Sequence, residues 1–419
     1  MRQNQTEVLV VGAGPIGLWS ALLLAESGVE AIVIDREART TARSYACALH
    51  PATLRLLDRF GLAESVIERG RRIETVAFYD GPNRQAEIHL SKLGGEFPFL
   101  LMLPQSALEG LLEQRLRAAG VSVQWNHRFE GVEEEQEGVE TVIEELEGTS
   151  TGYIVPHWET VVKSRSTLRA QFLIGADGHN SMVRPRTNLE YQRFGNAQSF
   201  AAFEFETGET VPDELRVVLG DSGTNVLWPL PNNRCRWTFQ IARSDFPGDF
   251  PEKDRRAVRL AEPAVDERIR QYVQKVSKQR APWFNNEIQR VHWCTEVTFE
   301  RRLAAQFGRN HCWLAGDAAH QTGPAGVQSM NMGFVEASSL TCAIKKILRE
   351  GAPIEQLEGY NQDWQKEWHF LLGTKGGLKA RTEASQWVAE RSAEILPCLP
   401  AHGKELVALA SQLQLAPVN

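Results

Sequence analysis

The order of apolar and polar residues predicts a β-α-β unit at the start of the chain. Residues from Glu7 to Val11 form an apolar strand typical of a parallel sheet covered on both faces, and helical spacing follows from Gly17 to Ser27. A second apolar strand is predicted from Ala31 to Ile34. The uncharged segment from Val8 to Ala25 is long enough for a membrane helix, but glycine and proline interrupt its first half. A buried strand followed by a buried helix therefore explains this segment better.

The middle of the chain changes to a period of two, which is typical of an antiparallel sheet. From residue 197 to 241, apolar Phe203 and Phe205 alternate with Glu204 and Glu206, which predicts one buried face and one solvated face. A Pro-Asn-Asn-Arg turn predicts a hairpin between strands at residues 226–229 and 236–241.

The rest of the chain returns to alternating strands and helices. Helices are predicted at residues 51–59, 106–119 and 332–348, and strands at residues 121–125, 172–174 and 311–315. The Glu-rich stretch at 130–147 retains valine and isoleucine, so we expect solvated strands and turns there. The end of the chain, from residue 351, is expected to be mostly helical.

Composition and charge exclude several classes of protein. The 419 residues carry a net charge of -7 without a block of lysine and arginine, so neither nucleic acid nor an anionic membrane is an expected partner. The six cysteines form no C-x-x-C pair, so no metal site is expected. Scattered single cysteines indicate reduced thiols and a cytoplasmic location.

The first motif that carries chemistry is Gly-Ala-Gly-Pro-Ile-Gly, between the first strand and the first helix. Gly12 permits the tight turn, Gly14 lets the backbone approach a pyrophosphate, and Gly17 lets the helix pack close to the strand. The helix N-terminus offers N–H groups to phosphates, and Asp35 can accept hydrogen bonds from both ribose hydroxyls. This motif predicts a dinucleotide site but does not distinguish FAD from NAD.

Two later motifs also place an aspartate after an apolar strand. The segment from Gly175 to Arg184 holds Asp177 in a glycine-bounded turn, where it either contacts a ligand or caps the next segment. The segment from Leu314 to Gly333 holds Asp317, followed by a loop of glycine, proline and small residues. A flat ring can lie against such a loop because few side chains obstruct it.

In this order and at these separations, the three motifs resemble the para-hydroxybenzoate hydroxylase family of class A flavoprotein monooxygenases, over about residues 5 to 350. The resemblance implies non-covalent FAD. It assigns the ADP half to the first motif, the ribityl-pyrophosphate chain to Arg43 and Gln105, and a ribityl hydroxyl to Asp317. It links Asp177 to both FAD and the nicotinamide nucleotide. The expected cofactor-binding residues are Gly12, Gly14, Pro15, Gly17, Asp35, Arg36, Arg43, Gln105, Asp177, Gly316, Asp317, Pro324, Gly326, Val327 and Asn331.

The chain departs from this family in three places. A short helical tail replaces the thioredoxin-like domain of the long aromatic hydroxylases. Glu336 stands where many relatives have aspartate, and Leu230 stands where the benzoate hydroxylases have a carboxylate-binding arginine. With Trp228 and Thr238, Leu230 is expected to face the substrate, which we predict to be a mostly apolar, electron-rich aromatic compound larger than a benzoate.

Other residues leave alternatives open. His320 invites a catalytic role, but a structural hydrogen-bonding role is favoured. His50 could reach the flavin edge, and either His50 or Cys47 could in principle attach the flavin covalently. Trp237 shares a face with other apolar residues, so a place in the core is favoured over a place in a pocket.

These patterns predict an α/β fold, α+β overall. It comprises a Rossmann-like FAD-binding domain (residues 1–78, 97–187 and 296–350), an inserted antiparallel-sheet substrate domain (79–96 and 188–295) and C-terminal helices (351–419). A helix beginning near Gly326 would point its positive end at the flavin ring and stabilise the negative charge of the reduced form.

The resemblance implies that NAD(P)H binds transiently and reduces FAD, and that O2 then forms a flavin C4a-hydroperoxide that hydroxylates an aromatic ring. The catalytic acid or base is not identified, and the protein is expected to be a monomer or homodimer. Alternatives are a reductase of the same fold acting on prenyl double bonds and a non-catalytic FAD-binding protein. A halogenase is disfavoured because the W-x-W-x-I-P segment is missing.

Overall fold

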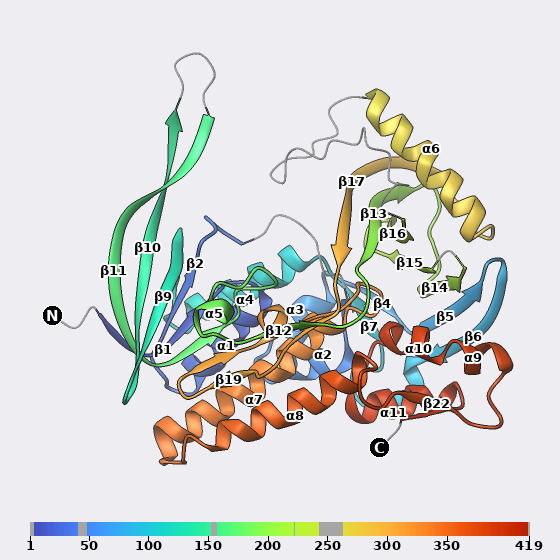
Figure 1. Ribbon diagram of the computed structural model, residues 1–419. Helices are drawn as coiled ribbons and strands as arrows, with labels where there is room; N and C mark the ends of the chain where they lie inside the picture. The colour runs from blue at the N-terminus through green and yellow to red at the C-terminus, as the bar shows by residue number, and fades with distance from the viewer. Residues whose placement is uncertain (1–3, 41–47, 152–156, 222, 243–262, 418–419) are drawn as a thin grey trace.

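The first sheet positions the three motifs, and it confirms the α/β class (Figure 1). The computed structural model describes residues 4–40, 48–151, 157–221, 223–242 and 263–417. The strand order in this sheet is β19 (Gly308–Arg309), β20 (Cys312–Leu314), β11 (His157–Gly175), β1 (Gln5–Val11), β2 (Ala31–Asp35) and β8 (Val123–Trp125). From β11 the sheet continues into β10 (Gly138–Thr151) and β9 (His127–Glu135), and β10 and β11 extend away from the body as a long hairpin.

The parallel strands β1, β11 and β20 end side by side. In the register of the sheet, Val11 lies opposite Gly175, and Gly175 lies opposite Leu314. The pairing continues past the strands, because the Ala176 N–H donates to the Val11 carbonyl at 2.8 Å and the Ala315 N–H donates to the Gly175 carbonyl at 3.0 Å. Each motif therefore leaves the sheet at the same edge, where ligands bind in open α/β sheets.

Helices cover this sheet. The predicted first helix is α1 (Pro15–Glu26), which packs against α4 (Gln105–Ala118) and α7 (Gln328–Glu350). Trp19 of α1 is fully buried, and its ring lies 5.6 Å from that of Phe334 in α7. α8 (Gln356–Leu371) packs in turn on α7. The segment that resembles a membrane helix is thus a strand and a buried helix, as predicted.

The second sheet contains the predicted hairpin. Its order is β17 (Ile288–Phe299), β13 (Gln198–Thr207), β16 (Arg234–Ile241), β15 (Gly223–Pro229), β14 (Glu214–Gly220), β5 (Thr75–Asp80) and β6 (Asn83–His89). Neighbouring strands are antiparallel except β14 and β5, which are parallel. The face that carries Phe203 and Trp237 packs with α6 (Pro263–Arg280) in a core of its own. Trp237 is a core residue, as predicted, and it stacks on Phe239 at 5.0 Å.

The opposite face of this sheet corrects one prediction. Glu204 and Glu206 lie there, as the alternation predicts, but their side chains are only 13% and 35% exposed rather than solvated. Trp228 on the same face belongs to the main core, together with residues of the first sheet. This face therefore turns toward the body of the protein, and the two glutamates pair with Arg236 and His292.

Smaller elements complete the fold. The remaining helices are α2 (Pro51–Asp58), α3 (Ala63–Ile67), α5 (Val183–Arg186), α9 (Gln386–Glu390), α10 (Ser392–Ile395), α11 (Gly403–Gln412), η1 (Leu90–Leu93), η2 (Gly316–Ala318) and η3 (Leu396–Cys398). The remaining strands are β3 (Ala48–Leu49), β4 (Arg71–Ile73), β7 (Leu100–Met102), β12 (Tyr191–Arg193), β18 (Arg302–Ala304), β21 (His320–Gln321), β22 (Leu378–Ala380) and β23 (Leu415–Pro417).

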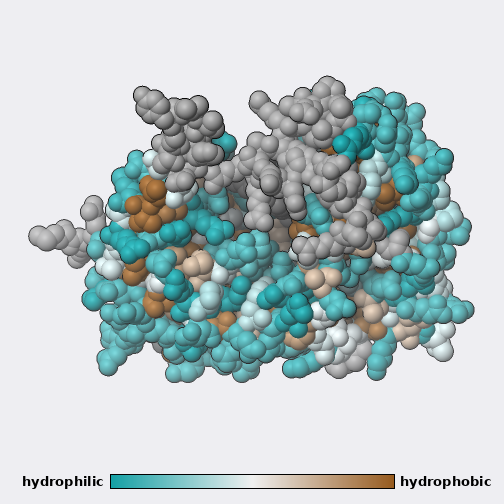
Figure 2. All heavy atoms as spheres, turned by 45° about the horizontal axis from the view of Figure 1, so that its top comes forward, coloured by the Kyte–Doolittle hydropathy of each residue, from teal (hydrophilic) through white to brown (hydrophobic). Residues whose placement is uncertain are grey.

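The length and hydropathy of the helices bear on whether they could cross a membrane. Within the described ranges, none of the helices combines the length and apolar character needed to cross a membrane. The coloured surface in Figure 2 is mostly hydrophilic, and its hydrophobic spots are small and separate.

Candidate active site

Three glycines shape the turn between β1 and α1, each for a different reason. Gly12 has φ +105°, and a Cβ there would lie 2.3 Å from the Ala176 carbonyl oxygen. A Cβ on Gly17 would lie 1.8 Å from the Gly12 carbonyl oxygen, so the helix can pack this closely only with glycine. A Cβ on Gly14, in contrast, would meet nothing within 4 Å. Gly14 thus faces open space at the start of α1, where a ligand can approach the backbone.

The start of α1 is suited to an anion. Gly14 is the N-cap and Pro15 is the first helical residue, and no side chain caps the helix. The first turn of a helix has N–H groups without intrahelical acceptors, and its dipole attracts negative charge. These groups fit the pyrophosphate of a dinucleotide.

Asp35 lies at the end of β2, beside the glycine-rich turn. Its carboxylate accepts hydrogen bonds from the Ala13 N–H at 2.6 Å and the Glu37 N–H at 2.8 Å. Burial raises the pKa of Asp35, and the two N–H bonds offset this only in part. Each oxygen keeps a lone pair for a further donor such as a ribose hydroxyl. The Arg36 side chain is 50% exposed and lies 3.8 Å from Glu37.

Asp177 caps the next segment, and its predicted contact with a ligand remains a prediction. Its Oδ2 accepts from the Met182 N–H at 2.6 Å and the Val183 N–H at 3.1 Å, so the residue caps α5. Its Oδ1 is buried and has no hydrogen-bond partner among the described residues. Burial raises the pKa of this carboxyl group. A buried acceptor without a partner needs an explanation, and a ligand donor at this edge would supply one.

The Gly-Asp motif lies next to the first motif. Gly316 has φ +64°, and a Cβ there would lie 2.9 Å from the Ile16 side chain of α1. Asp317 is half-buried and accepts a hydrogen bond from the Ser329 hydroxyl. His320 is fully buried between Ser329 and Glu336, which agrees with the structural role favoured by the sequence.

The loop from Pro324 to Val327 leads into α7, which begins at Gln328, close to the predicted start near Gly326. Val327 has φ +49°, a conformation that is strained for a β-branched residue and tends to occur at functional sites. Asn331 holds this turn, because its side-chain amide donates to the Val327 carbonyl at 2.8 Å.

His50 packs beneath the same loop. Its main-chain N–H donates to Asn331 Oδ1 at 2.8 Å, and its ring Nε2 lies 2.9 Å from the Gly326 carbonyl oxygen. Burial lowers the pKa of His50 to about 3, so the imidazole is neutral at pH 7. Because Nε2 contacts this carbonyl, Nδ1 is the ring nitrogen that remains for a bond to flavin. Cys47, the other attachment candidate, lies outside the described residues.

Gln105 and Arg43 are the two other residues predicted to contact the cofactor. Gln105 begins α4, and its side chain donates to Glu109 at 2.8 Å. Arg43 lies outside the described residues, so its contact with the ribityl-pyrophosphate chain remains a prediction.

The predicted substrate residues lie on the inward face of the second sheet. Trp228, Leu230 and Thr238 are 2%, 3% and 4% exposed. Leu230 lies just beyond β15 and lines a cavity of about 650 Å³ at the hairpin turn, together with Arg71 and Asn232. None of the predicted cofactor residues lines that cavity.

A row of four residues on this face was not foreseen from the sequence. Trp228, Arg236, Glu204 and Trp293 lie opposite one another on β15, β16, β13 and β17. Arg236 is 3% exposed, donates to Glu204 at 2.9 Å and lies over the Trp293 ring at 5.3 Å. The alternation of β13 predicts the position of Glu204, but nothing in it reveals the ion pair across the strands.

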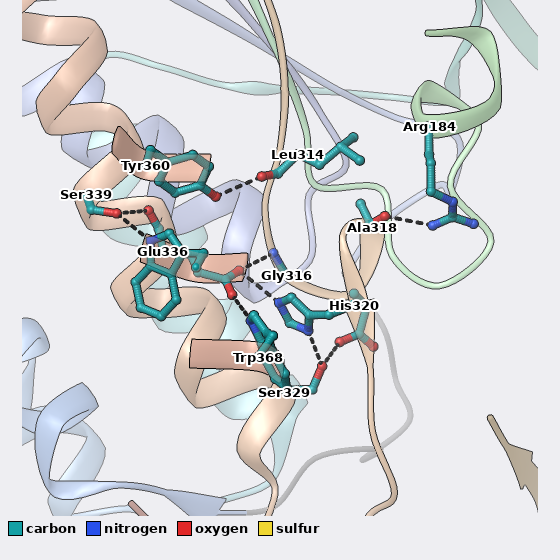
Figure 3. Close-up of polar contacts among 12 residues, drawn as sticks. Arg184, Leu314, Gly316, Ala318, His320, Ser329, Glu336, Ser339, Tyr360 and Trp368 are labelled. Atoms are coloured by element: carbon teal, nitrogen blue, oxygen red, sulfur yellow. Dashed lines mark hydrogen bonds and ion pairs between the residues drawn. The ribbon is translucent and has the colours of Figure 1, made fainter. Parts of the chain in front are cut away.

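Two other contacts were also missed. Arg184, at the end of the second motif, donates to the Ala318 carbonyl at 2.7 Å (Figure 3). Gln328 donates to the carbonyls of Leu396 and Leu399, so the C-terminal tail packs on the loop before α7. Both contacts join segments far apart in the chain, which local spacing does not reveal. The Arg184 guanidinium also lies 3.6 Å over the nearby Tyr191 ring.

The fold and the site define a dinucleotide-binding α/β enzyme whose glycine cradle, uncapped helix and unpartnered Asp177 oxygen fit FAD. A family model described as an FAD binding domain matches residues 5–367, so the chain belongs to that family and FAD is its cofactor. The resemblance to class A flavoprotein hydroxylases is confirmed, and the chain is a flavin-dependent enzyme of this class.

Relatives agree with this membership. An uncharacterised aromatic compound monooxygenase of Bacillus subtilis is 27% identical over 395 residues, which cover 91% of this chain and 72% of the relative. A para-nitrophenol 4-monooxygenase of a Pseudomonas species is 28% identical over 374 residues, which cover 86% and 82%.

Solved structures agree on the fold. The crystal structure of a p-nitrophenol 4-monooxygenase from Pseudomonas putida has a TM-score of 0.73 at 21% identity and covers 98% of this chain and 95% of its own. A ternary complex of aklavinone-11 hydroxylase with FAD and aklavinone has a TM-score of 0.66 at 21% identity and covers 86% and 66%.

Proposed function

We propose that this chain hydroxylates an electron-rich aromatic compound, using FAD, NAD(P)H and O2. The observation that carries this proposal is the meeting of the glycine-rich turn, Asp177 and Asp317 at one edge of the first sheet. In this proposal, the turn and α1 hold the pyrophosphate, Asp35 the ribose, and Asp317 the ribityl chain. Bound FAD supplies the redox chemistry, since it accepts a hydride from NAD(P)H and reacts with O2.

The start of α7 favours this chemistry electrostatically. We propose that the Gly326–Val327 turn places the N-terminus of α7 beside the flavin ring. A helix of this length presents a partial positive charge there, which stabilises the negative charge of reduced flavin. The domain division is also part of this proposal. The FAD-binding domain, the substrate domain and the C-terminal helices would meet at residues 78, 96, 187, 295 and 350.

The substrate class follows from the inward face of the second sheet. Trp293 is half-buried and offers aromatic surface to a ring, and Arg236 beside it is paired with Glu204. A bare carboxylate there would compete with Glu204 for Arg236, whereas a neutral phenol would not. The relatives named as nitrophenol and pentachlorophenol monooxygenases support a phenolic substrate.

The test compares oxygen-coupled NAD(P)H oxidation on neutral polycyclic phenols, p-nitrophenol and hydroxybenzoates. We expect the neutral phenols to stimulate oxidation more than the hydroxybenzoates do. A preference for small hydroxybenzoates that is lost in Arg236→Ala would contradict the proposed substrate class, because it would show that Arg236 anchors a carboxylate. Oxidation that continues at full rate without O2 would favour a reductase of the same fold.

A further inference from the structure

A chain of hydrogen bonds runs from the core to Asp317 (Figure 3). Oε2 of Glu336 in α7 accepts from the Gly316 N–H at 2.9 Å and lies 2.8 Å from Nε2 of His320. Nδ1 of His320 lies 3.2 Å from the Ser329 hydroxyl, which donates to Asp317. Glu336 and His320 are 0% exposed, whereas Ser329 and Asp317 are half-buried. The chain therefore leads from a fully buried carboxylate to the predicted flavin ligand.

The hydrogens in this chain can be counted. The contacts Glu336–His320, His320–Ser329 and Ser329–Asp317 each need one hydrogen. A neutral imidazole has one N–H and a serine has one O–H, so these two residues supply only two of the three. While the Ser329 hydrogen points to Asp317, the single imidazole N–H can serve either Glu336 or the Ser329 oxygen, so the tautomer of His320 sets the direction of the chain.

Three donors surround the buried Glu336 carboxylate. A fully buried carboxylate without such partners would be costly. The third donor is the Trp368 indole N–H, which lies 2.5 Å from Oε1 of Glu336. The Trp368 ring also stacks on His320, with centroids 3.8 Å apart. Helix α8 thus fixes both the carboxylate and the imidazole ring.

We propose that Glu336 and His320 are positioning residues that orient Asp317 for its contact with FAD, acting through the Ser329 hydroxyl. This inference rests on the proposed function, because it takes Asp317 as a flavin ligand. Ser329 directs its only hydrogen to Asp317, while its oxygen lies 3.2 Å from Nδ1 of His320. Glu336 and Trp368 hold the imidazole ring in place against Ser329. Asp317 is thereby fixed in direction.

The test measures the FAD affinity of the apoprotein by fluorescence titration. Ser329→Ala removes the hydroxyl that connects His320 to Asp317, and we expect about 10-fold weaker binding, as for the loss of a hydrogen bond to a charged group. Ser329→Thr keeps the hydroxyl and should restore most of that loss. Glu336→Gln should weaken binding in a similar way, and the double variant should bind no more weakly than Ser329→Ala alone.

A matched control comes from the same helix. Within the described part of the chain, the Ser339 hydroxyl donates to the main-chain carbonyl of Glu336 and accepts from the Trp364 indole. Ser339→Ala should therefore bind FAD with wild-type affinity. Additive losses in the double variant would overturn the relay, because Glu336 would then act independently of Ser329. Equal FAD affinities of Ser329→Ala and wild type would overturn it too. This comparison can be made even if Glu336→Gln fails to fold, because Ser329→Ala keeps the buried carboxylate.

The relay and the proposed function fail in different ways. If the wild-type protein binds no FAD, the proposed function is wrong. If wild type binds FAD and Asp317→Ala binds it about 10-fold or more weakly, Asp317 is a ligand and only the Ser329 and Glu336 variants decide the relay.

Discussion

At the scale of single residues, the glycines of the first turn separate what the fold requires from what the cofactor requires. Gly12 and Gly17 are needed for packing, because a Cβ on either would overlap backbone atoms. Gly14 has φ -71° and ψ -176°, which any residue can adopt, and its Cβ position is open. The packing of the protein thus does not require glycine at position 14, whereas a ligand that approaches the backbone there would require it.

This difference predicts opposite results for two alanine variants. Gly14→Ala should change the free energy of unfolding of the apoprotein by less than about 0.5 kcal/mol, yet weaken FAD binding by about 10-fold or more. Gly17→Ala should destabilise the apoprotein by about 1–3 kcal/mol, because the helix must move away from the strand. Urea unfolding and FAD titration measure both effects. Wild-type FAD affinity in Gly14→Ala would show that the cofactor does not approach this residue.

His50 predicts a pH dependence of stability. Its folded pKa of about 3 lies below the usual histidine value, so on acidification the unfolded chain takes up a proton that the folded protein does not. The stability is intact above about pH 6.5 and is lost as the pH falls toward 3. Between pH 7 and pH 5, the wild type should lose about 2 kcal/mol relative to His50→Gln. Parallel pH profiles of the two proteins would show that His50 titrates normally.

At the scale of elements, the C-terminal tail and the loop before α7 form one unit. A Cβ on Gly326 would lie 2.4 Å from the Pro397 carbonyl oxygen, and the Gln328 amide donates to the carbonyls of Leu396 and Leu399 at 3.2 and 3.1 Å. The C-terminal tail thus supports the turn proposed to lie beside the flavin.

Gln328→Ala should loosen this contact. The Leu399 carbonyl would lose its Gln328 donor, whereas the Leu396 carbonyl would keep the Leu399 N–H. The expected cost is about 1–3 kcal/mol. The expected result is a lower urea midpoint and faster proteolysis within residues 391–417. Gln386→Ala provides the control, because that exposed side chain bonds only within its own helix to Glu390. Equal proteolysis of the two variants would mean that Gln328 does not hold the tail.

Local pattern predicted the elements better than the contacts between them. The apolar runs and glycines correctly placed β1, α1, β2 and the β15–β16 hairpin, because each of these depends on periodicity or turn chemistry within a few residues. The strand ending at Ile174 proved far longer, since β11 starts at His157 and pairs with β10 through polar residues. The burial of Glu204 was missed because the packing of one sheet on another part of the chain leaves no local signal.

At the scale of the whole molecule, two cores lie on opposite faces of the second sheet. The main core joins the first sheet to Val226, Trp228 and Leu230, and the second core lies beneath α6 on the other face. The motifs on the first sheet could be recognised from sequence because backbone geometry demands their glycines. The Arg236–Glu204 pair and the Glu336–His320 pair each form between segments brought together only by the fold, so their chemistry had to come from the structure.

The most direct test of the central claim is the origin of the oxygen in the product. The phenol that most stimulates NAD(P)H oxidation is incubated with the holoenzyme and NAD(P)H under ¹⁸O2 in ordinary water, and the product is analysed by mass spectrometry. A monooxygenase inserts one atom of O2, so the hydroxylated product should carry a single ¹⁸O, and a parallel reaction in H2¹⁸O under ordinary O2 should give unlabelled product. Label from water, or NAD(P)H oxidation that yields only hydrogen peroxide with every phenol tested, would contradict the assignment.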